Sequence, residues 1–271
     1  MDLKRILTTI LGLPIVALIF IFCNNYIIDI LLMIISIMCM HEYLGVIKKV
    51  SHPMELIAYL STVIIGIASF VTKNEIMQIT VFSIPFIMLF LFLKVIITDM
   101  KITFKDAAYT MLGITYIVIF ILFLALIRGL PNGQILIGYV AIVAWSTDIF
   151  AYLIGRQFGK HKFSKVSPKK SIEGCIAGIV GAIVFSYIYI FIINKALNTD
   201  YSLIYVVISA AILSAISQVG DFVASCIKRF ADVKDYGNIL PGHGGMLDRI
   251  DSLIFVAPFA YMIFTIFMQK M

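Results

Sequence analysis

Charged residues are scarce in this sequence. Only 13% of its 271 residues are Asp, Glu, Lys or Arg, whereas 62% are apolar, and the mean hydropathy is +1.06. A soluble domain carries about 25% charged and roughly 45–50% apolar residues. A chain of this composition has too few polar side chains to cover a surface that faces water. The composition therefore excludes an ordinary soluble protein and predicts an integral membrane protein.

The sequence also gives no indication of a disulfide or zinc site, of a cleavable signal peptide or of nucleic-acid binding. The cysteines form no CxxC pair and no metal-ligand spacing, so neither disulfides nor a zinc site is expected. The first apolar stretch lacks a clear small-residue cleavage site and more such stretches follow, so no cleavable signal peptide is expected. The formal charge of +6 does not indicate nucleic acid, because the lysines lie in loops between apolar segments, where they set membrane orientation. The four cysteines are Cys23, Cys39, Cys175 and Cys226.

Nine apolar stretches are long enough to cross a membrane. A helix needs about 20 residues, at 1.5 Å rise each, to span the hydrocarbon core, and it satisfies its own backbone there. Continuous apolar runs argue against a barrel of short alternating strands. We expect an all-α, polytopic transmembrane helix bundle of about nine spans. The predicted spans are residues 6–22, 26–45, 56–72, 77–97, 107–127, 134–154, 172–194, 202–227 and 252–269.

Polar residues gather in the second half of the chain. The loops at 155–171 and 228–251 contain most of the Gly, Lys, His and Asp clusters. We expect a single integral membrane domain over residues 1–271. Within it, the spans of 1–133 are predicted to be a scaffold and those of 134–271 to carry the catalytic motifs.

Basic residues divide unequally between the two sides of the predicted membrane. Of the 21 Lys and Arg residues, 17 fall on the side of the N-terminus. Because cytoplasmic loops carry an excess of Lys and Arg, the N-terminus and both polar loops are predicted to be cytoplasmic. An odd number of spans puts the C-terminus outside. We expect a multi-pass protein of the cell inner (plasma) membrane, with its active site facing the cytoplasm.

Two acidic residues, Asp148 and Asp221, lie inside predicted spans. An ionisable side chain at that depth costs about 2.5–3.5 kcal/mol and usually serves a function. Asp221 shares one helical face with Ser225 and Lys228, which follow at i+4 and i+7. Neither Asp221 nor the later Asp248 has an obvious cationic partner that would make it a structural ion pair, although Lys228 and Arg249 are nearby candidates.

Two more acids open the ninth span. Asp248 and Asp251 are one helical turn apart, so they share a face that could converge with Asp221. Carboxylates combined with substrate phosphates are the usual ligands of Mg²⁺. The glycines of the preceding Pro-Gly-His-Gly-Gly segment, 241–245, let backbone N–H groups approach phosphate oxygens. The alternatives are that Asp248 only complements the helix dipole and that the glycines only form a turn.

The 155–171 loop contains a run of lysines. Lys169 and Lys170 precede the seventh span and could bind a triphosphate or an anionic headgroup. The alternative is orientation charge with attraction to anionic lipid, worth about 1 kcal/mol per basic residue. We favour binding for these two lysines, and orientation charge for Lys160, Lys162 and Lys165.

Residues 225–251 resemble the signature of the phosphatidate cytidylyltransferases, also called CDP-diacylglycerol synthases. That signature reads S-x-φ-K-R-x4-K-D-x-G-x2-φ-P-x-H-G-G-φ-x-D-R-φ-D, where φ is apolar, and every specified position is filled. With more than a dozen fixed identities, the match is far more specific than a lone glycine-rich motif. The segments 148–160 and 167–174 also resemble this family, with Ser171 where Thr is common. The resemblance is strongest over 144–255.

The resemblance implies an enzyme of phospholipid biosynthesis. The family transfers CMP from CTP to phosphatidic acid, which releases pyrophosphate and gives CDP-diacylglycerol. By resemblance, Asp221 and Asp248 would bind Mg²⁺, with Asp251 as a third carboxylate, and a second, monovalent site would hold K⁺. CTP, phosphatidic acid and the lipid bilayer are the expected partners; nucleic acid is not expected, and a homodimer is left open.

General chemistry agrees with this activity. A lipid phosphate oxygen can attack the α-phosphorus of CTP in line, with Mg²⁺ and basic side chains offsetting the charge. A phosphate monoester is already ionised at neutral pH, so His243 is predicted to donate a hydrogen bond to phosphate rather than act as a base. The predicted catalytic residues are Asp221, Asp248, Asp251, Lys228, Arg229, His243 and Arg249. The predicted substrate-binding residues are Asp148, Arg156, Lys169, Lys170, Ser225, Lys234, Gly244 and Gly245.

Other classes of membrane protein remain as alternatives. A CTP-dependent lipid kinase is the closest, and its lipid product would gain only a phosphate. A transporter should show paired broken helices or symmetry between its halves, whereas polar residues here are concentrated in one half. The CDP-alcohol phosphotransferase pattern, D-G-x2-A-R…G-x3-D-x3-D, is absent from the sequence.

Overall fold

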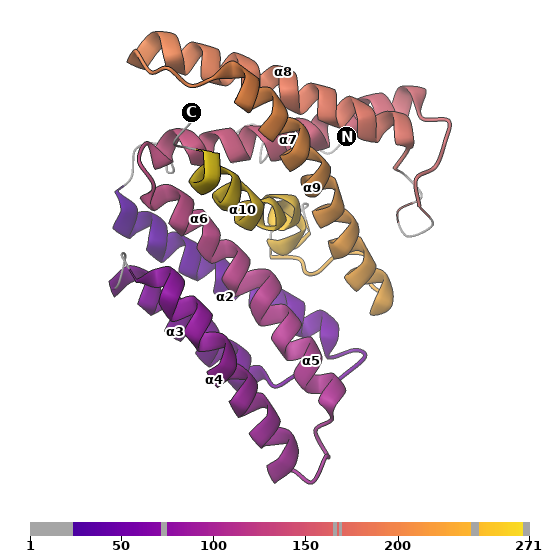
Figure 1. The fold of residues 1–271 in the computed structure, drawn as a ribbon. Coiled ribbons are helices and arrows are strands. Elements are labelled where there is room, and N and C mark those ends of the chain that lie inside the picture. The colour runs from indigo at the N-terminus through magenta and orange to yellow at the C-terminus, as the bar shows by residue number, and fades with distance from the viewer. Residues whose placement is uncertain (1–23, 72–74, 165–166, 168–169, 240–243, 268–271) are drawn as a thin grey trace. The chain divides into compact units, whose positions relative to one another are not determined.

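The computed structural model describes residues 24–71, 75–164, 167, 170–239 and 244–267. Across these residues the regular structure is helical, and an isolated β-bridge joins Lys162 and Ser171 (Figure 1). The all-α prediction is therefore confirmed for the described part of the chain. The helices are α2 (Asn25–Ile47), α3 (Glu55–Val71), α4 (Ile76–Ile97), α5 (Phe104–Gly113), η1 (Ile114–Ile119), α6 (Phe120–Gly129), α7 (Gly133–Phe158), α8 (Ile172–Leu197), α9 (Leu203–Phe230) and α10 (Leu247–Phe267).

Seven helices in the described residues are long and apolar enough to cross a membrane, counting α5, η1 and α6 as one continuous run. The chain is therefore a multi-pass membrane protein. The expected number of nine spans is not confirmed. Helix α3, at the predicted span 56–72, has 17 residues and is shorter than the others, and the predicted span 6–22 lies outside the described residues.

Exposed aromatic side chains on α4 agree with a membrane location. Phe82, Phe86 and Phe90 are 66%, 63% and 58% exposed. Their spacing of four residues places them on one helical face. Such an apolar face would be unfavourable in water, whereas hydrocarbon solvates it well.

The chain divides into two compact units. The first comprises residues 1–131 and 228–250, and the second comprises 132–227 and 251–271. Helices α9 and α10 each contribute to both. Most of the signature, from Lys228 to Ile250, therefore belongs to the same unit as the N-terminal helices. The expected single domain over the whole chain stays a prediction.

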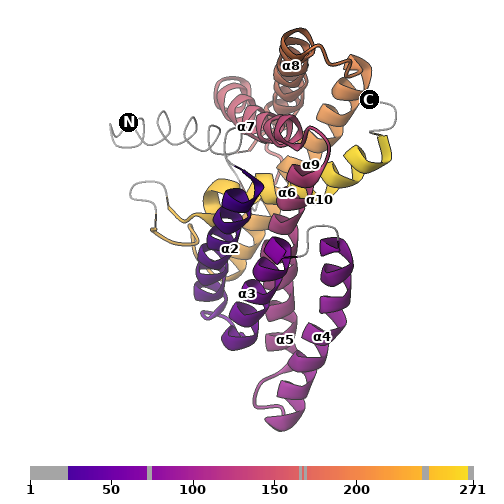
Figure 2. The ribbon, with the colours of Figure 1, turned by 90° about the vertical axis from the view of Figure 1, so that its left-hand side faces the viewer.

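In the first unit, α2, α3, α4 and the α5–η1–α6 run lie side by side (Figures 1 and 2). A buried carboxylate joins α5 to the connection between α2 and α3. Asp106, near the start of α5, accepts hydrogen bonds from the Ser51 hydroxyl and from the His52 N–H, the latter at 2.7 Å. The same carboxylate forms a capping box with Thr103. Asp106 thus fixes the α2–α3 connection and the start of α5 together.

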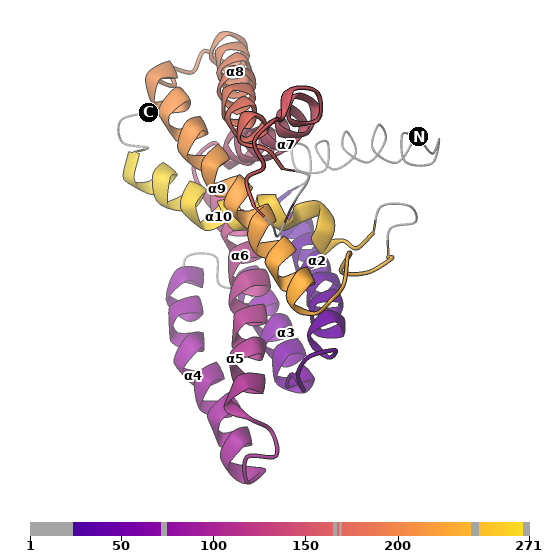
Figure 3. The same cartoon turned by 90° about the vertical axis from the view of Figure 1, so that its right-hand side faces the viewer.

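In the second unit, α7 and α8 form an antiparallel pair and lie side by side (Figures 1 and 3). Their close approach requires glycine, because a Cβ atom on Gly174 would lie 3.0 Å from the Cα of Gly155. Helix α9 is joined to α7 by buried hydroxyls: Tyr139 donates to the Val206 carbonyl at 2.9 Å and Thr147 donates to Ser214 at 2.7 Å. Interhelical hydrogen bonds of this kind satisfy polar groups that hydrocarbon would leave unpaired.

Candidate active site

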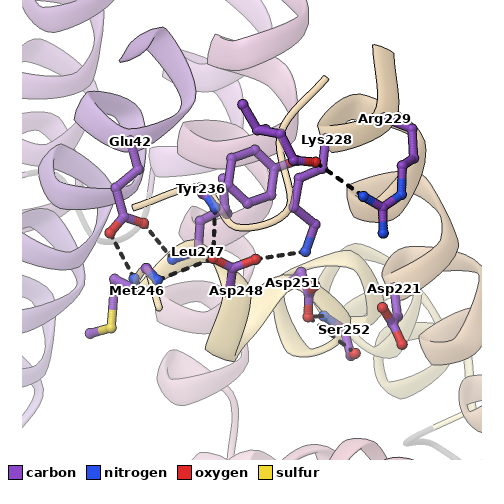
Figure 4. A network of polar contacts seen from close by, with 12 residues as sticks. Glu42, Asp221, Lys228, Arg229, Tyr236, Met246, Leu247, Asp248, Asp251 and Ser252 are labelled. Atoms are coloured by element: carbon purple, nitrogen blue, oxygen red, sulfur yellow. Dashed lines mark hydrogen bonds and ion pairs between the residues drawn. The ribbon is translucent and has the colours of Figure 1, made fainter. Parts of the chain in front are cut away.

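Asp248, one of the predicted catalytic residues, accepts three hydrogen bonds. It lies in the first turn of α10, and its side chain is 3% exposed. Its Oδ1 accepts from Lys228 Nζ at 2.6 Å, and its Oδ2 accepts from the N–H groups of Tyr236 and Gly245, at 2.8 and 3.1 Å (Figure 4). The structure therefore brings together the acid and the lysine that the sequence pattern predicted. A carboxylate held by three donors has a fixed orientation.

Lys228 reaches Asp248 from the last turn of α9. That turn also carries Arg229, and cations are favourable at a helix C-terminus. The helix ends where Asp232 adopts a left-handed conformation, with φ of 52°, and the Val233 N–H bonds back to the Lys228 carbonyl at 2.9 Å. The Lys228 ammonium also lies 5.3 Å from the centre of the Tyr236 ring. The lysine is thus held by a carboxylate and an aromatic face, with 13% of its side chain exposed.

Glu42 of α2 is a site residue that the sequence analysis missed. Its carboxylate, on a residue that is 3% exposed, accepts from the N–H groups of Met246 and Leu247, both at 2.8 Å (Figure 4). The signal for it was present, since Glu42 is an acid inside the predicted span 26–45, the criterion that singled out Asp221.

The predicted phosphate-binding glycines lie between these two carboxylates. Gly244 has a φ of +80°, which side chains rarely adopt, and the N–H of Gly245 is bonded to Asp248. Their role in binding a substrate stays a prediction.

The second unit contains another lysine–aspartate pair. Asp221 of α9 forms an ion pair with Lys170, and their side chains are 29% and 23% exposed. The Lys170 ammonium also lies 4.1 Å from the centre of the neighbouring Phe222 ring. A lysine that the sequence predicted to bind substrate therefore contacts an acid predicted to bind metal.

Lys170 lies in the connection between α7 and α8, and described residues of this connection contact α8 and α9. The Phe163 N–H bonds to the Lys170 carbonyl at 3.1 Å, and the Phe163 ring stacks on Phe222 of α9, with centroids 4.8 Å apart. At the base of the connection, His161 Nδ1 lies 2.6 Å from Glu173 Oε1. The hydroxyl of Ser171 caps α8 by accepting from the Gly174 N–H. The ends of this segment are thus tied to α8 and α9.

Asp148 and Asp251 are linked through Ser252, a second residue that the sequence analysis missed. The Ser252 hydroxyl donates to Asp148 Oδ2 at 3.3 Å, and its N–H donates to Asp251 Oδ1 at 2.8 Å. Asp251 is 7% exposed. Ser252 follows the last residue of the signature directly, so its position in the sequence was the available signal.

The remaining predicted residues are exposed, half-buried or outside the described residues. Arg229 is exposed and donates to the Val233 carbonyl at 3.3 Å, and Arg156 is exposed and donates to the Tyr152 hydroxyl at 3.2 Å. Lys234 and Arg249 are exposed, and Ser225 is half-buried. Lys169 and His243 lie outside the described residues.

The expectation that neither acid has an obvious cationic partner is wrong for Asp221, which pairs with Lys170. Asp248 pairs with Lys228, which the sequence offered as a candidate partner. Among the described residues, no three His, Cys, Asp or Glu side chains are grouped as a closed metal site. Mg²⁺ usually binds one or two carboxylates and completes its shell with water and substrate phosphates. The carboxylates of these acids are oxygen ligands of the kind that this mode of binding uses, and their binding of Mg²⁺ stays a prediction.

Comparison with known proteins identifies the family. Residues 3–267 match the model of the cytidylyltransferase family. A phosphatidate cytidylyltransferase of Bacillus subtilis is 35% identical over 193 residues, which cover 70% of this chain and 69% of that protein. Those of Staphylococcus saprophyticus and Staphylococcus aureus are each 36% identical over 60% of this chain and 61% of their own length. Because the family model matches nearly the whole sequence, the chain belongs to the cytidylyltransferase family.

Proposed function

We propose that this protein transfers CMP from CTP to phosphatidic acid and so forms CDP-diacylglycerol and pyrophosphate for phospholipid biosynthesis. The relatives with 35–36% identity bear the name of this activity. The observation that carries the proposal is the complete signature over 225–251, in which Lys228 and Asp248 form a buried ion pair.

Asp221, Asp248 and Asp251 are the proposed ligands of Mg²⁺. The support is their chemistry and their placement on helices: Asp221 shares a face of α9 with Lys228, and Asp251 follows Asp248 by one turn of α10. Bound there, Mg²⁺ would offset the negative charge on the attacking and leaving oxygens. A second site for K⁺ and a homodimer belong to the same proposal.

The basic side chains would hold the phosphates of both substrates. Lys228 and Lys170 already contact carboxylates, so each can exchange a carboxylate oxygen for a phosphate oxygen without leaving an ammonium unpaired. Arg229 and Arg249 are exposed and free to turn toward an anionic group. In this reaction a lipid phosphate oxygen forms a bond to the α-phosphorus as the bond to pyrophosphate breaks. The attacking oxygen is already ionised, so no residue has to remove a proton.

The reaction is proposed to take place at the cytoplasmic face of the inner membrane. Nine spans with a cytoplasmic N-terminus put 17 of the 21 Lys and Arg residues on that side. CTP is a cytoplasmic metabolite, so a nucleotide site on this face has direct access to its substrate.

Mass analysis of the lipid product tests the proposal. Purified protein is incubated with CTP, Mg²⁺ and phosphatidic acid, and we expect a lipid that has gained CMP, together with pyrophosphate. Phosphatidylcholine, which has no terminal phosphate monoester, serves as the control and should not react. A lipid that has gained only a phosphate would establish the lipid kinase instead, and unchanged lipid would refute both activities.

A further inference from the structure

The N-terminus of α10 is bonded to a buried acid from a distant part of the sequence. Glu42 precedes Met246 by 204 residues and bonds its N–H through Oε1, whereas Oε2 bonds the N–H of Leu247. Both distances are 2.8 Å, and the residue is 3% exposed. Burial of a carboxylate is costly unless hydrogen bonds compensate it. An acid that is buried in an apolar helix at this cost usually has a role beyond packing.

Glu42 and Asp248 together use three consecutive N–H groups. Gly245 donates to Asp248, and Met246 and Leu247 donate to Glu42 (Figure 4). Free N–H groups at a helix N-terminus commonly bind phosphate. At this helix the protein's own carboxylates accept from these three donors, and the bonds hold the loop and Asp248 in place.

Glu42 also accounts for two glycines of the signature. A Cβ atom on Gly245 would lie 2.6 Å from Glu42 Oε2, and one on Gly237 would lie 2.9 Å from Oε1. Neither glycine has a positive φ; among the described glycines only Gly244 does. A Cβ atom at 237 or 245 would therefore displace the Glu42 carboxylate from its present position.

We propose that Glu42 is a positioning residue for the transfer reaction: it fixes the loop that orients the Asp248 carboxylate toward the reacting groups. This rests on the proposed function, in which Asp248 acts at the reacting centre. The proposal separates Glu42 from an ordinary helix cap, because a cap would affect only the stability of the protein.

Glu42→Gln is the first test, because it keeps the size of the side chain but replaces one acceptor oxygen with an NH₂ group. Loss of one charge-assisted hydrogen bond should lower kcat/KM by about ten- to a hundredfold. Hydrogen exchange of the amides at 245–248 should become faster. The matched control is Asp106→Asn, which removes the charge of a buried capping acid that contacts Ser51, His52 and Thr103 instead of this loop. It should speed exchange around 51–54 and 103–110 and leave kcat/KM within about threefold of the wild type.

A paired substitution adds a test that does not depend on the stability of Glu42→Gln. Gly245→Ala should displace the Glu42 carboxylate and lower kcat/KM, and Glu42→Asp, which shortens the acid by one methylene, should restore part of the activity in the double variant. Such recovery shows direct coupling between the two positions. Faster exchange at 245–248 with unchanged kcat/KM, or the absence of recovery in the double variant, would overturn the positioning role. Failure of the wild type to form CDP-diacylglycerol would instead refute the proposed function, and the exchange measurement would still decide whether Glu42 holds the loop.

Discussion

The two acids proposed as metal ligands differ in how they are held. Asp248 accepts from three donors and its side chain is 3% exposed, whereas Asp221 pairs with Lys170 and its side chain is 29% exposed. An acid that loses its charge leaves its lysine unpaired, and the cost is larger where the pair is more buried. The two residues should therefore be equivalent in catalysis and different in stability.

Asp221→Asn and Asp248→Asn are each expected to lower turnover by about a hundredfold or more, because a neutral amide holds Mg²⁺ poorly and leaves charge in the transition state unbalanced. Thermal denaturation in detergent should show a larger loss of stability for Asp248→Asn. Asp232→Asn is the control, since Asp232 is exposed and Asn tolerates its left-handed backbone. Near-normal activity of Asp221→Asn at saturating Mg²⁺ would contradict the metal assignment.

The sequence identified those site residues that lie close to one another along the chain, within one motif. Asp248 and Lys228 were both identified because each lies in a dense motif and close to a helix end. Glu42 could have been noticed as an acid inside a predicted span, but its partners could not, because they are 204 and 205 residues away and helical periodicity does not indicate such contacts. The partner of Asp221 was missed for a similar reason: Lys170 is on a separate connection, and spacing within α9 says nothing about it.

At the scale of elements, hydropathy located the helices better than it located their ends. The predicted spans 134–154 and 202–227 are α7 (Gly133–Phe158) and α9 (Leu203–Phe230). Both helices continue into charged residues, because backbone hydrogen bonding does not stop where the apolar run does. Helix α10 begins at Leu247, five residues before the predicted 252, since the carboxylates of Glu42 and Asp248 satisfy its first N–H groups.

Two lysines in the connection between α7 and α8, Lys170 and Lys162, are expected to differ in their effect on substrate binding. Lys170→Ala removes the partner of Asp221 and the contact with Phe222, so it should raise the KM for CTP or for the lipid by about tenfold, the loss of one charged contact. Lys162→Ala is the control, because the side chain of Lys162 is exposed and the residue takes part in its bridge to Ser171 through the backbone. If both substitutions had equal and negligible effects, the lysines of this loop would serve membrane orientation and not substrate binding.

At the scale of the whole molecule, the sequence predicted the class of protein but did not predict that residues 228–250 group with the N-terminal helices. Long apolar runs indicate which segments can enter lipid, and from them we predicted an all-α membrane protein. The grouping of residues 228–250 with the N-terminal helices depends on contacts such as those of Glu42, which join distant parts of the sequence. Composition and periodicity carry no information about such contacts.

Membrane orientation is the last prediction, and the lengths of α8 and α9 make it sharp. Their 26 and 28 residues correspond to roughly 39 and 42 Å at 1.5 Å rise per residue, which exceeds the hydrocarbon thickness of about 30 Å. Each helix is therefore long enough for its two ends to reach opposite sides of the membrane. The excess of basic residues predicts that the α7–α8 and α9–α10 connections are cytoplasmic and that the α8–α9 connection is outside.

Single cysteines, introduced after replacement of the four native ones, would be labelled with a membrane-impermeant thiol reagent. Lys162→Cys and Asn238→Cys should react only in inside-out vesicles, and Asp200→Cys should react in intact cells; all three positions are exposed. The three sites control for one another, because a leaky membrane would label them all. Labelling of 162 or 238 from outside intact cells, with 200 protected, would reverse the orientation and would place the proposed nucleotide site on the face that CTP does not reach.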